Sequence, residues 1–230
     1  MLWYKGWLET RFRLLFALGL TGLILFLLHS VPLDGKAKIF AILEYSTLTI
    51  LMLICAMLSG AGIVTQAPFQ AKKGLQASTI FTLSLPVSRL RLLAVRAGLG
   101  WLEAAGAIGA LCCGMWLISP ALRMMTTPVE MLEYAGTLIA CASAIYFLSV
   151  LLATFLDDVW RTWGTLIVFA AFWWISNHTP LPAFANIFRA MGKGSPLIAH
   201  TTPWNAIAFS VALSAILLFA ALRVVQAREY

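Results

Sequence analysis

Long, almost unbroken apolar runs make up most of the chain, and short polar stretches separate them. Six of these runs are long enough, or nearly so, to cross ~30 Å of hydrocarbon as α-helices. The pattern predicts an all-α, polytopic membrane protein with six transmembrane helices. The predicted spans are Leu14–Leu28, Tyr45–Val64, Leu92–Ile118, Leu132–Leu156, Thr162–Ser176 and Trp204–Val225.

The stretch before the first span, residues 1–12, has helical periodicity of a different kind. At 100° per residue three charged side chains fall on one face and the aromatic side chains gather opposite, with Arg11 as the one charged residue on the apolar side. This pattern predicts an N-terminal amphipathic helix lying in the headgroup layer. A charged extension of the first span is the alternative. The charged face holds Lys5, Glu9 and Arg13, and the opposite face holds Trp3, Tyr4, Trp7 and Leu8.

The segment between the fifth and sixth spans contains two short apolar pieces. Pro182 is a residue that can start a helix and Gly192 one that can end it, which predicts a helix around Ala183–Met191. A second apolar patch follows at Pro196–Ala199. Pieces this short, interrupted by glycine and proline, predict interfacial or re-entrant helices.

Composition agrees with this membrane assignment. The chain has 230 residues, of which 61% are hydrophobic and 11% charged, and its mean hydropathy is +0.90. Soluble domains carry roughly 25% charged residues. Six spans of about 20 residues leave no room for a soluble domain, so residues 1–230 are predicted to form one transmembrane domain.

The net charge of +7 is distributed around the spans and does not form a soluble basic patch, which argues against a nucleic-acid partner. Lysine and arginine are enriched on the cytosolic side of membrane proteins. With both termini in the cytosol, eleven of these residues lie inside and five outside. The inner residues are Lys5, Arg11, Arg13, Lys72, Lys73, Arg89, Arg91, Arg96, Arg161, Arg223 and Arg228; the outer ones are Lys36, Lys38, Arg123, Arg189 and Lys193.

Motifs of common enzyme classes are missing from the sequence. It has no GxxxxGK[ST] phosphate loop, no HExxH zinc motif and no GxSxG elbow. The four cysteines lie in apolar runs without CxxC spacing, which favours packing over metal binding. We therefore expect a non-catalytic chain with no metal and no cofactor of its own.

Glu103 is a carboxylate within the third span. It lies 12 residues beyond Arg91, or ~18 Å along a helix, which places it near mid-bilayer. An ionised carboxylate there costs at least ~2.5 kcal/mol, so Glu103 must be protonated, paired or in a wet cavity. Two interpretations stay open: a polar contact in a substrate path or subunit seam, or a hydrogen bond to a neighbouring span.

Small residues recur every four positions in the third and fourth predicted spans. Such stripes let helix backbones approach closely. Packing within the chain is the simpler interpretation, and contact between subunits is the alternative. The stripes are Gly106, Ala110 and Gly114, and Gly136, Ala140 and Ala144.

The polar segment between the second and third spans carries a motif. The sequence Thr79-Ile80-Phe81-Thr82-Leu83-Ser84-Leu85-Pro86-Val87-Ser88-Arg89 is followed by the basic residue Arg96. It resembles the permease subunits of the type-two family of ATP-binding-cassette exporters, in which a short helix ends in L-x-x-P-[VI]-S-R. The six spans, the amphipathic start and Ser195-Pro196 in the last outer loop agree with this layout.

The resemblance implies a transmembrane exporter subunit in the cell (inner) membrane, with both termini cytosolic. A separate cytosolic ATPase would bind ATP and Mg, and a second permease, identical or related, would complete a dimer among the membrane lipids. The cytosolic coupling helix of this chain, between the second and third spans, would dock on the ATPase. Family members often carry acidic residues and Gly-Thr where this chain has lysines and Ala77-Ser78. The docking residues implied are Lys72, Lys73, Ser78, Thr79, Phe81, Thr82, Leu85, Pro86 and Arg89.

The apolar interior and the aromatic outer segment favour a lipid-like or amphipathic cargo. The physical argument for a motor stands beside the resemblance, because a transporter without a nucleotide site needs a partner to couple ATP to movement. A different class is the alternative: an ATP-independent intramembrane enzyme or proton-coupled carrier that uses Glu103. A membrane anchor without transport is a third possibility.

Overall fold

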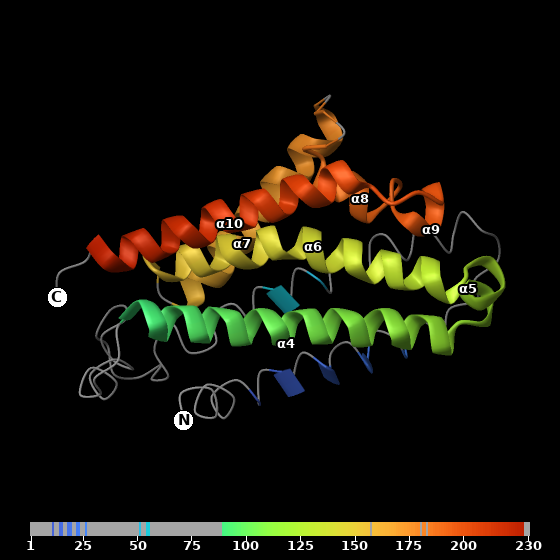
Figure 1. Ribbon diagram of the computed structural model, residues 1–230, viewed down its shortest axis with the longest axis horizontal. Coiled ribbons are helices and arrows are strands. Elements are labelled where there is room, and N and C mark those ends of the chain that lie inside the picture. The colour runs from blue at the N-terminus through green and yellow to red at the C-terminus, as the bar shows by residue number, and fades with distance from the viewer. Residues whose placement is uncertain are drawn as a thin grey trace.

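The computed structural model describes residues 89–156, 158–179, 181–182 and 184–227, together with isolated positions between 11 and 55. All regular structure in this part of the chain is helical, which confirms the all-α prediction for it. Figure 1 shows long helices running side by side, with the short ones gathered towards the end away from the C-terminus. The helices are α4 (Arg89–Ile118), α5 (Pro120–Met125), α6 (Pro128–Ala153), α7 (Asp158–His178), α8 (Ile187–Met191), α9 (Pro196–Ala199) and α10 (Trp204–Ala227).

Three helices are long and apolar enough to cross a membrane: Leu93–Ile118 within α4, and the whole of α6 and α10. They overlap the third, fourth and sixth predicted spans. The helix α7 covers the fifth, but Arg161 and four tryptophans lower its hydropathy, and tryptophan favours the membrane interface. The first and second predicted spans lie mostly outside the described residues, so the count of six stays a prediction.

Helix starts in the described region follow a repeated Ser/Thr-Pro rule. Ser119, Thr127 and Ser195 are the N-cap residues of α5, α6 and α9, and each is followed by proline at the first helical position. Proline suits that position because its fixed φ is helical and its missing N–H would have no intrahelical partner. Three of the helix starts are thus encoded in dipeptides.

The start of α6 corrects a predicted boundary. We expected a span over Leu132–Leu156, but the helix covers Pro128–Ala153. Thr127 and Glu130 form a capping box, in which each side chain accepts a hydrogen bond from the other residue's backbone N–H. Because the box satisfies free N–H groups of the first turn, the helix begins one turn before its apolar run.

A second correction concerns Pro182. It does not start a helix; its carbonyl accepts turn hydrogen bonds from the N–H groups of Ala185 and Asn186. The helix begins later, at Ile187, because the Asn186 side chain accepts a hydrogen bond from Arg189 N–H and caps it. Gly192 does end this helix, and the second apolar patch forms α9 with the expected bounds, Pro196–Ala199.

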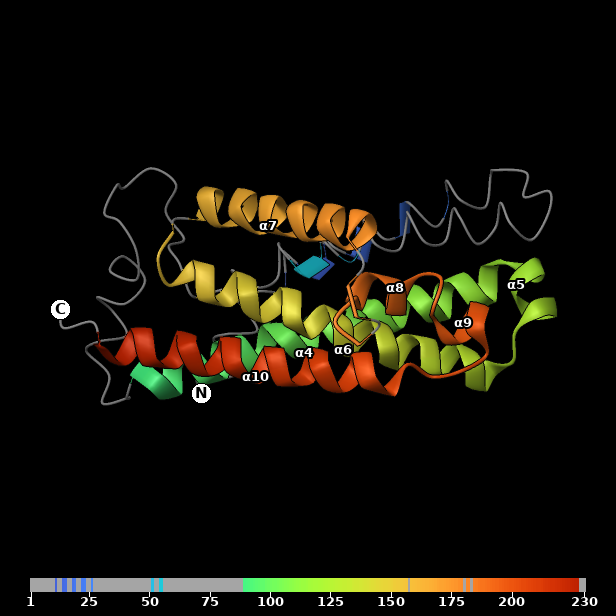
Figure 2. The same ribbon diagram turned by 90° about the horizontal axis from the view of Figure 1, so that it is seen from above.

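The helix α6 lies at the centre of the described structure. It packs against α4 and α10 over much of its length, against α7 along its C-terminal half, and against α8 and α9 in its N-terminal half, as Figures 1 and 2 show. Buried residues occur along its whole length, from Met131 to Ala153. Every other described helix except α5 therefore packs directly on α6.

Large apolar side chains on the outer faces of α7 and α10 are exposed, among them Trp160, Ile167, Val211, Ile216 and Phe219. A monomeric soluble protein rarely exposes contiguous apolar surface on this scale. These faces are therefore suited to lipid or to further helices, in agreement with a membrane protein.

Candidate functional site

The predicted docking segment lies almost entirely outside the described residues. These positions are Lys72, Lys73, Ser78, Thr79, Phe81, Thr82, Leu85 and Pro86. The one described member is Arg89, the first residue of α4.

The structure describes Glu103 and shows it buried within α4. Its side chain is 6% exposed, and that of Arg96 on the same helix is 7% exposed. The two residues are seven positions apart, or about two helical turns, so they share one face of α4. Gly100 lies between them and is also buried. Neither Arg96 nor Glu103 is without an interacting partner, as burial of charged groups requires.

Polar side chains join α4 to α6 next to this buried face. The Tyr146 hydroxyl donates to the backbone carbonyl of Ala97 at 2.9 Å. The Trp101 indole N–H donates to Ser143 Oγ at 2.8 Å, and the Ser143 hydroxyl donates to the Ile139 carbonyl at 2.7 Å. These bonds fix the register between the helix that carries Glu103 and the central helix.

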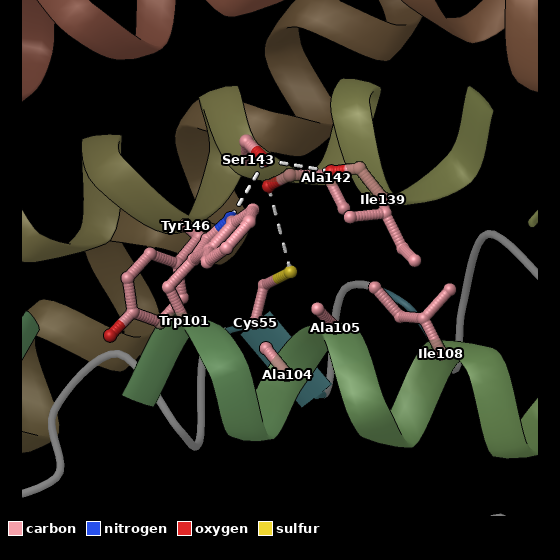
Figure 3. Close-up of a pocket in the computed structure, with 9 residues that line it drawn as sticks. All are labelled: Cys55, Trp101, Ala104, Ala105, Ile108, Ile139, Ala142, Ser143 and Tyr146. Carbon is pink, nitrogen blue, oxygen red and sulfur yellow. Dashed lines mark hydrogen bonds between the residues drawn. The ribbon is translucent and has the colours of Figure 1, made fainter. Parts of the chain in front are cut away.

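A small cavity lies in the same α4–α6 seam (Figure 3). Its volume is about 10 Å³, which is room for no more than one water molecule. The Cys55 thiol on its wall donates to the Ala142 carbonyl at 3.7 Å. Its remaining lining is mostly apolar, so this cavity is neither a cargo site nor a catalytic pocket. The lining residues are Cys55, Trp101, Ala104, Ala105, Ile108, Ile139, Ala142, Ser143 and Tyr146.

The predicted small-residue stripes differ in their surroundings. Ala144 is buried, but Gly106, Ala110 and Gly136 are exposed. A Cβ added at Gly106 or Gly136 would meet no described atom within 4 Å. Close packing within the described part of the chain therefore explains Ala144 and leaves the exposed glycines unexplained.

A second polar cluster, which the sequence analysis did not single out, lies at the other end of α6. His200 Nδ1 is 2.9 Å from Glu130 Oε1, and the Thr202 hydroxyl donates to Glu133 Oε2 at 2.9 Å. The motif Thr127-x-x-Glu130 is a capping-box sequence, and it could have indicated the Glu130 side of this cluster. Its partners are 69 and 70 residues away along the chain, beyond what local spacing can indicate.

Within the described part of the chain, no group of three or more His, Cys, Asp or Glu residues is placed to hold a metal ion. Three of the four cysteines are buried as expected for packing residues, while Cys113 is exposed. Comparisons of the chain with protein-family models, with curated proteins and with solved structures give no match in any of the three.

Proposed function

We propose that this chain is the membrane-spanning subunit of an ATP-driven exporter that works with a separate cytosolic ATPase. The observation that carries the proposal is the order of the sequence, in which the motif Thr79–Arg89 directly precedes a membrane-length helix. The described part of α4 covers Arg89–Ile118, 30 residues, so a force passed on through the motif would act along this helix. That helix is about 45 Å long and carries Glu103 on its buried face.

The path for cargo is proposed to lie between two copies of the chain. The α4–α6 cavity holds about 10 Å³, far less than the several hundred cubic ångströms that small-molecule sites enclose. A path between subunits would use exposed apolar faces such as those bearing Ile167 on α7 and Ile216 on α10. Apolar walls of this kind favour a lipid-like or amphipathic cargo.

Substitutions in the docking segment test the coupling. Pro86→Leu and Arg89→Glu are expected to leave membrane insertion unchanged and to uncouple ATP hydrolysis from transport, because the segment no longer transmits force to α4. The measurement is ATP hydrolysis and uptake of a fluorescent amphipathic probe in inside-out vesicles that contain the co-purified ATPase.

The matched control is Arg91→Glu, which makes the same charge change at an exposed position of α4 outside the docking set. Coupled transport is expected to persist in this variant. Unchanged transport in both Pro86→Leu and Arg89→Glu would refute the docking role, as would the failure of any ATP-binding-cassette ATPase to co-purify with the chain.

A second function, an ATP-independent proton-coupled carrier or intramembrane enzyme, is favoured by one observation. Glu103 is a carboxylate buried deep in a membrane-length helix, and such groups often mark proton or substrate paths.

Glu103→Gln separates the two functions, because glutamine keeps the size and hydrogen bonding of the side chain but cannot carry a proton. A carrier of this class works in vesicles of the purified chain without ATP, and Glu103→Gln abolishes that activity. An exporter subunit shows no transport without ATP and its motor, whichever residue stands at position 103.

A further inference from the structure

The end of α9 is tied to the start of α6 by two hydrogen bonds one helical turn apart. Glu130 holds the His200 ring and Glu133 holds the Thr202 hydroxyl, both at 2.9 Å. His200 ends α9 in the left-handed conformation, with φ 51° and ψ 25°. It is the one non-glycine residue with positive φ among the described residues. That conformation is uncommon for residues other than glycine.

The two carboxylate oxygens of Glu130 take part in two different interactions. Its Oε2 accepts hydrogen bonds from the Thr127 backbone N–H at 2.7 Å and from the Thr127 hydroxyl at 3.1 Å. Its Oε1 faces His200. The capping box therefore holds the carboxylate in place for the histidine, so α6 presents a preorganised acceptor to α9.

The tie covers a buried surface. Ser195, Pro196 and Leu197 of the α9 segment are buried, and α9 packs on α6. His200 itself remains 64% exposed and Glu130 27% exposed, so protons from the solvent reach the pair directly. Loss of the His200 bond would leave Thr202 as the polar tie on this side of α9.

We propose that His200 and Glu130 form a pH-sensitive latch that holds the α9 segment, residues 195–202, against the start of α6. Histidine changes charge between about pH 5 and pH 8. When the ring carries a proton the pair is an imidazolium and a carboxylate, and such charge-assisted hydrogen bonds are roughly twice as strong as neutral ones. When the ring is neutral the latch is weaker.

Other charged groups at this end of the bundle contribute to the electrostatic environment of the His200–Glu130 pair. In the described part of the chain these are Glu133 on α6, Arg123 on α5, Arg189 on α8, Lys193 just after α8, and His178 at the end of α7. Glu133 accepts the Thr202 hydrogen bond. Lysine and arginine keep their charge over this pH range, and His200 is the histidine that contacts Glu130. The inference does not depend on the transport function.

A cysteine introduced at a buried position of the α9 segment can be used to measure opening of the latch. Ser195 is 2% exposed, and Ser195→Cys is a nearly isosteric change. It is introduced into the full chain with the four native cysteines replaced by alanine, and its reaction with a hydrophilic maleimide is followed in detergent. The same background with Met124→Cys, at a residue 87% exposed, corrects for the pH dependence of thiol reactivity.

The ratio of the two labelling rates is expected to rise two- to five-fold, roughly, from about pH 5.5 to about pH 8, because an exposed ion pair contributes at most about 1 kcal/mol. In His200→Asn the ratio is expected to be independent of pH. Asparagine tolerates the left-handed conformation and keeps a neutral donor. A flat ratio in the native sequence, or the same rise in His200→Asn, would overturn the latch. If Ser195→Cys misfolds, Leu197→Cys, at a residue 3% exposed, gives the same comparison.

Discussion

Serine and threonine side chains act within this apolar bundle in two different ways. Ser214 donates to the carbonyl of Ser210, one turn back on the same helix, which satisfies the hydroxyl without joining two helices. Ser143 also donates to its own helix, but its oxygen accepts the Trp101 indole N–H from α4. Only the second arrangement contributes to the tertiary structure.

This difference gives a prediction for stability. Ser143→Ala removes the acceptor of the Trp101 N–H and is expected to lower the free energy of unfolding by about 1–3 kcal/mol. In a Trp101→Phe background the same substitution is expected to cost much less, because no donor is then left without a partner. Unfolding of the four proteins in mixed micelles measures the coupling as a double-mutant cycle.

Ser214→Ala is the matched control, because it removes a buried hydroxyl that bonds within its own helix. Its effect is expected to be the same with and without Trp101. A coupling energy near zero for Ser143 and Trp101 would contradict the role given to this bond.

At the scale of whole helices, the ends of the elements follow local sequence more closely than their faces do. Ser119-Pro120, Thr127-Pro128 and Ser195-Pro196 each mark a helix start, and the apolar run of α10 predicts its start at Trp204. Capping is a contact between residues three or four positions apart, so a short stretch of sequence is enough to predict it. The shift of the α8 start from Pro182 to Ile187 shows the competing effect of an asparagine cap.

Faces are harder to predict, because the long helices are apolar all round. The stripe of Gly106 and Ala110 on α4 suggested close packing, yet these residues are exposed, while Arg96 and Glu103 on the same helix are buried. In a soluble helix an apolar stripe identifies the core face. A membrane helix is surrounded by lipid as apolar as the core, so hydrophobicity does not distinguish the two faces.

For the whole molecule, the arrangement of α4, α6 and α10 gives a prediction of sidedness. The end of α4 and the start of α6 lie at one end of the bundle, the start of α10 points towards that end, and the C-terminal end of α10 lies at the opposite end (Figure 1). Met124→Cys on α5 is therefore expected to react with an impermeant maleimide in intact cells, in a background without native cysteines. Gln226→Cys at the end of α10 is expected to react only after the membrane is opened.

Labelling of both cysteines from the same side would contradict a bundle that spans the membrane, because the two sites lie at opposite ends. Labelling of Gln226→Cys alone in intact cells would leave the span in place and reverse the orientation deduced from lysine and arginine.

The sequence by itself determined that the described chain is helical and apolar on a membrane scale, and it located the long helices and the short α9. It also identified Glu103 as an unusual intramembrane carboxylate. The length of an apolar run, its composition and its capping residues depend only on nearby sequence, so they can be predicted without knowing how the helices pack.

Only the tertiary structure decided that α6 lies at the centre, that Arg96 and Glu103 face inward, and that Trp101 meets Ser143. It also brought His200 to Glu130 across 70 residues. Such pairings depend on how helices pack, and a helix that is apolar on every side carries no periodic signal for its partners.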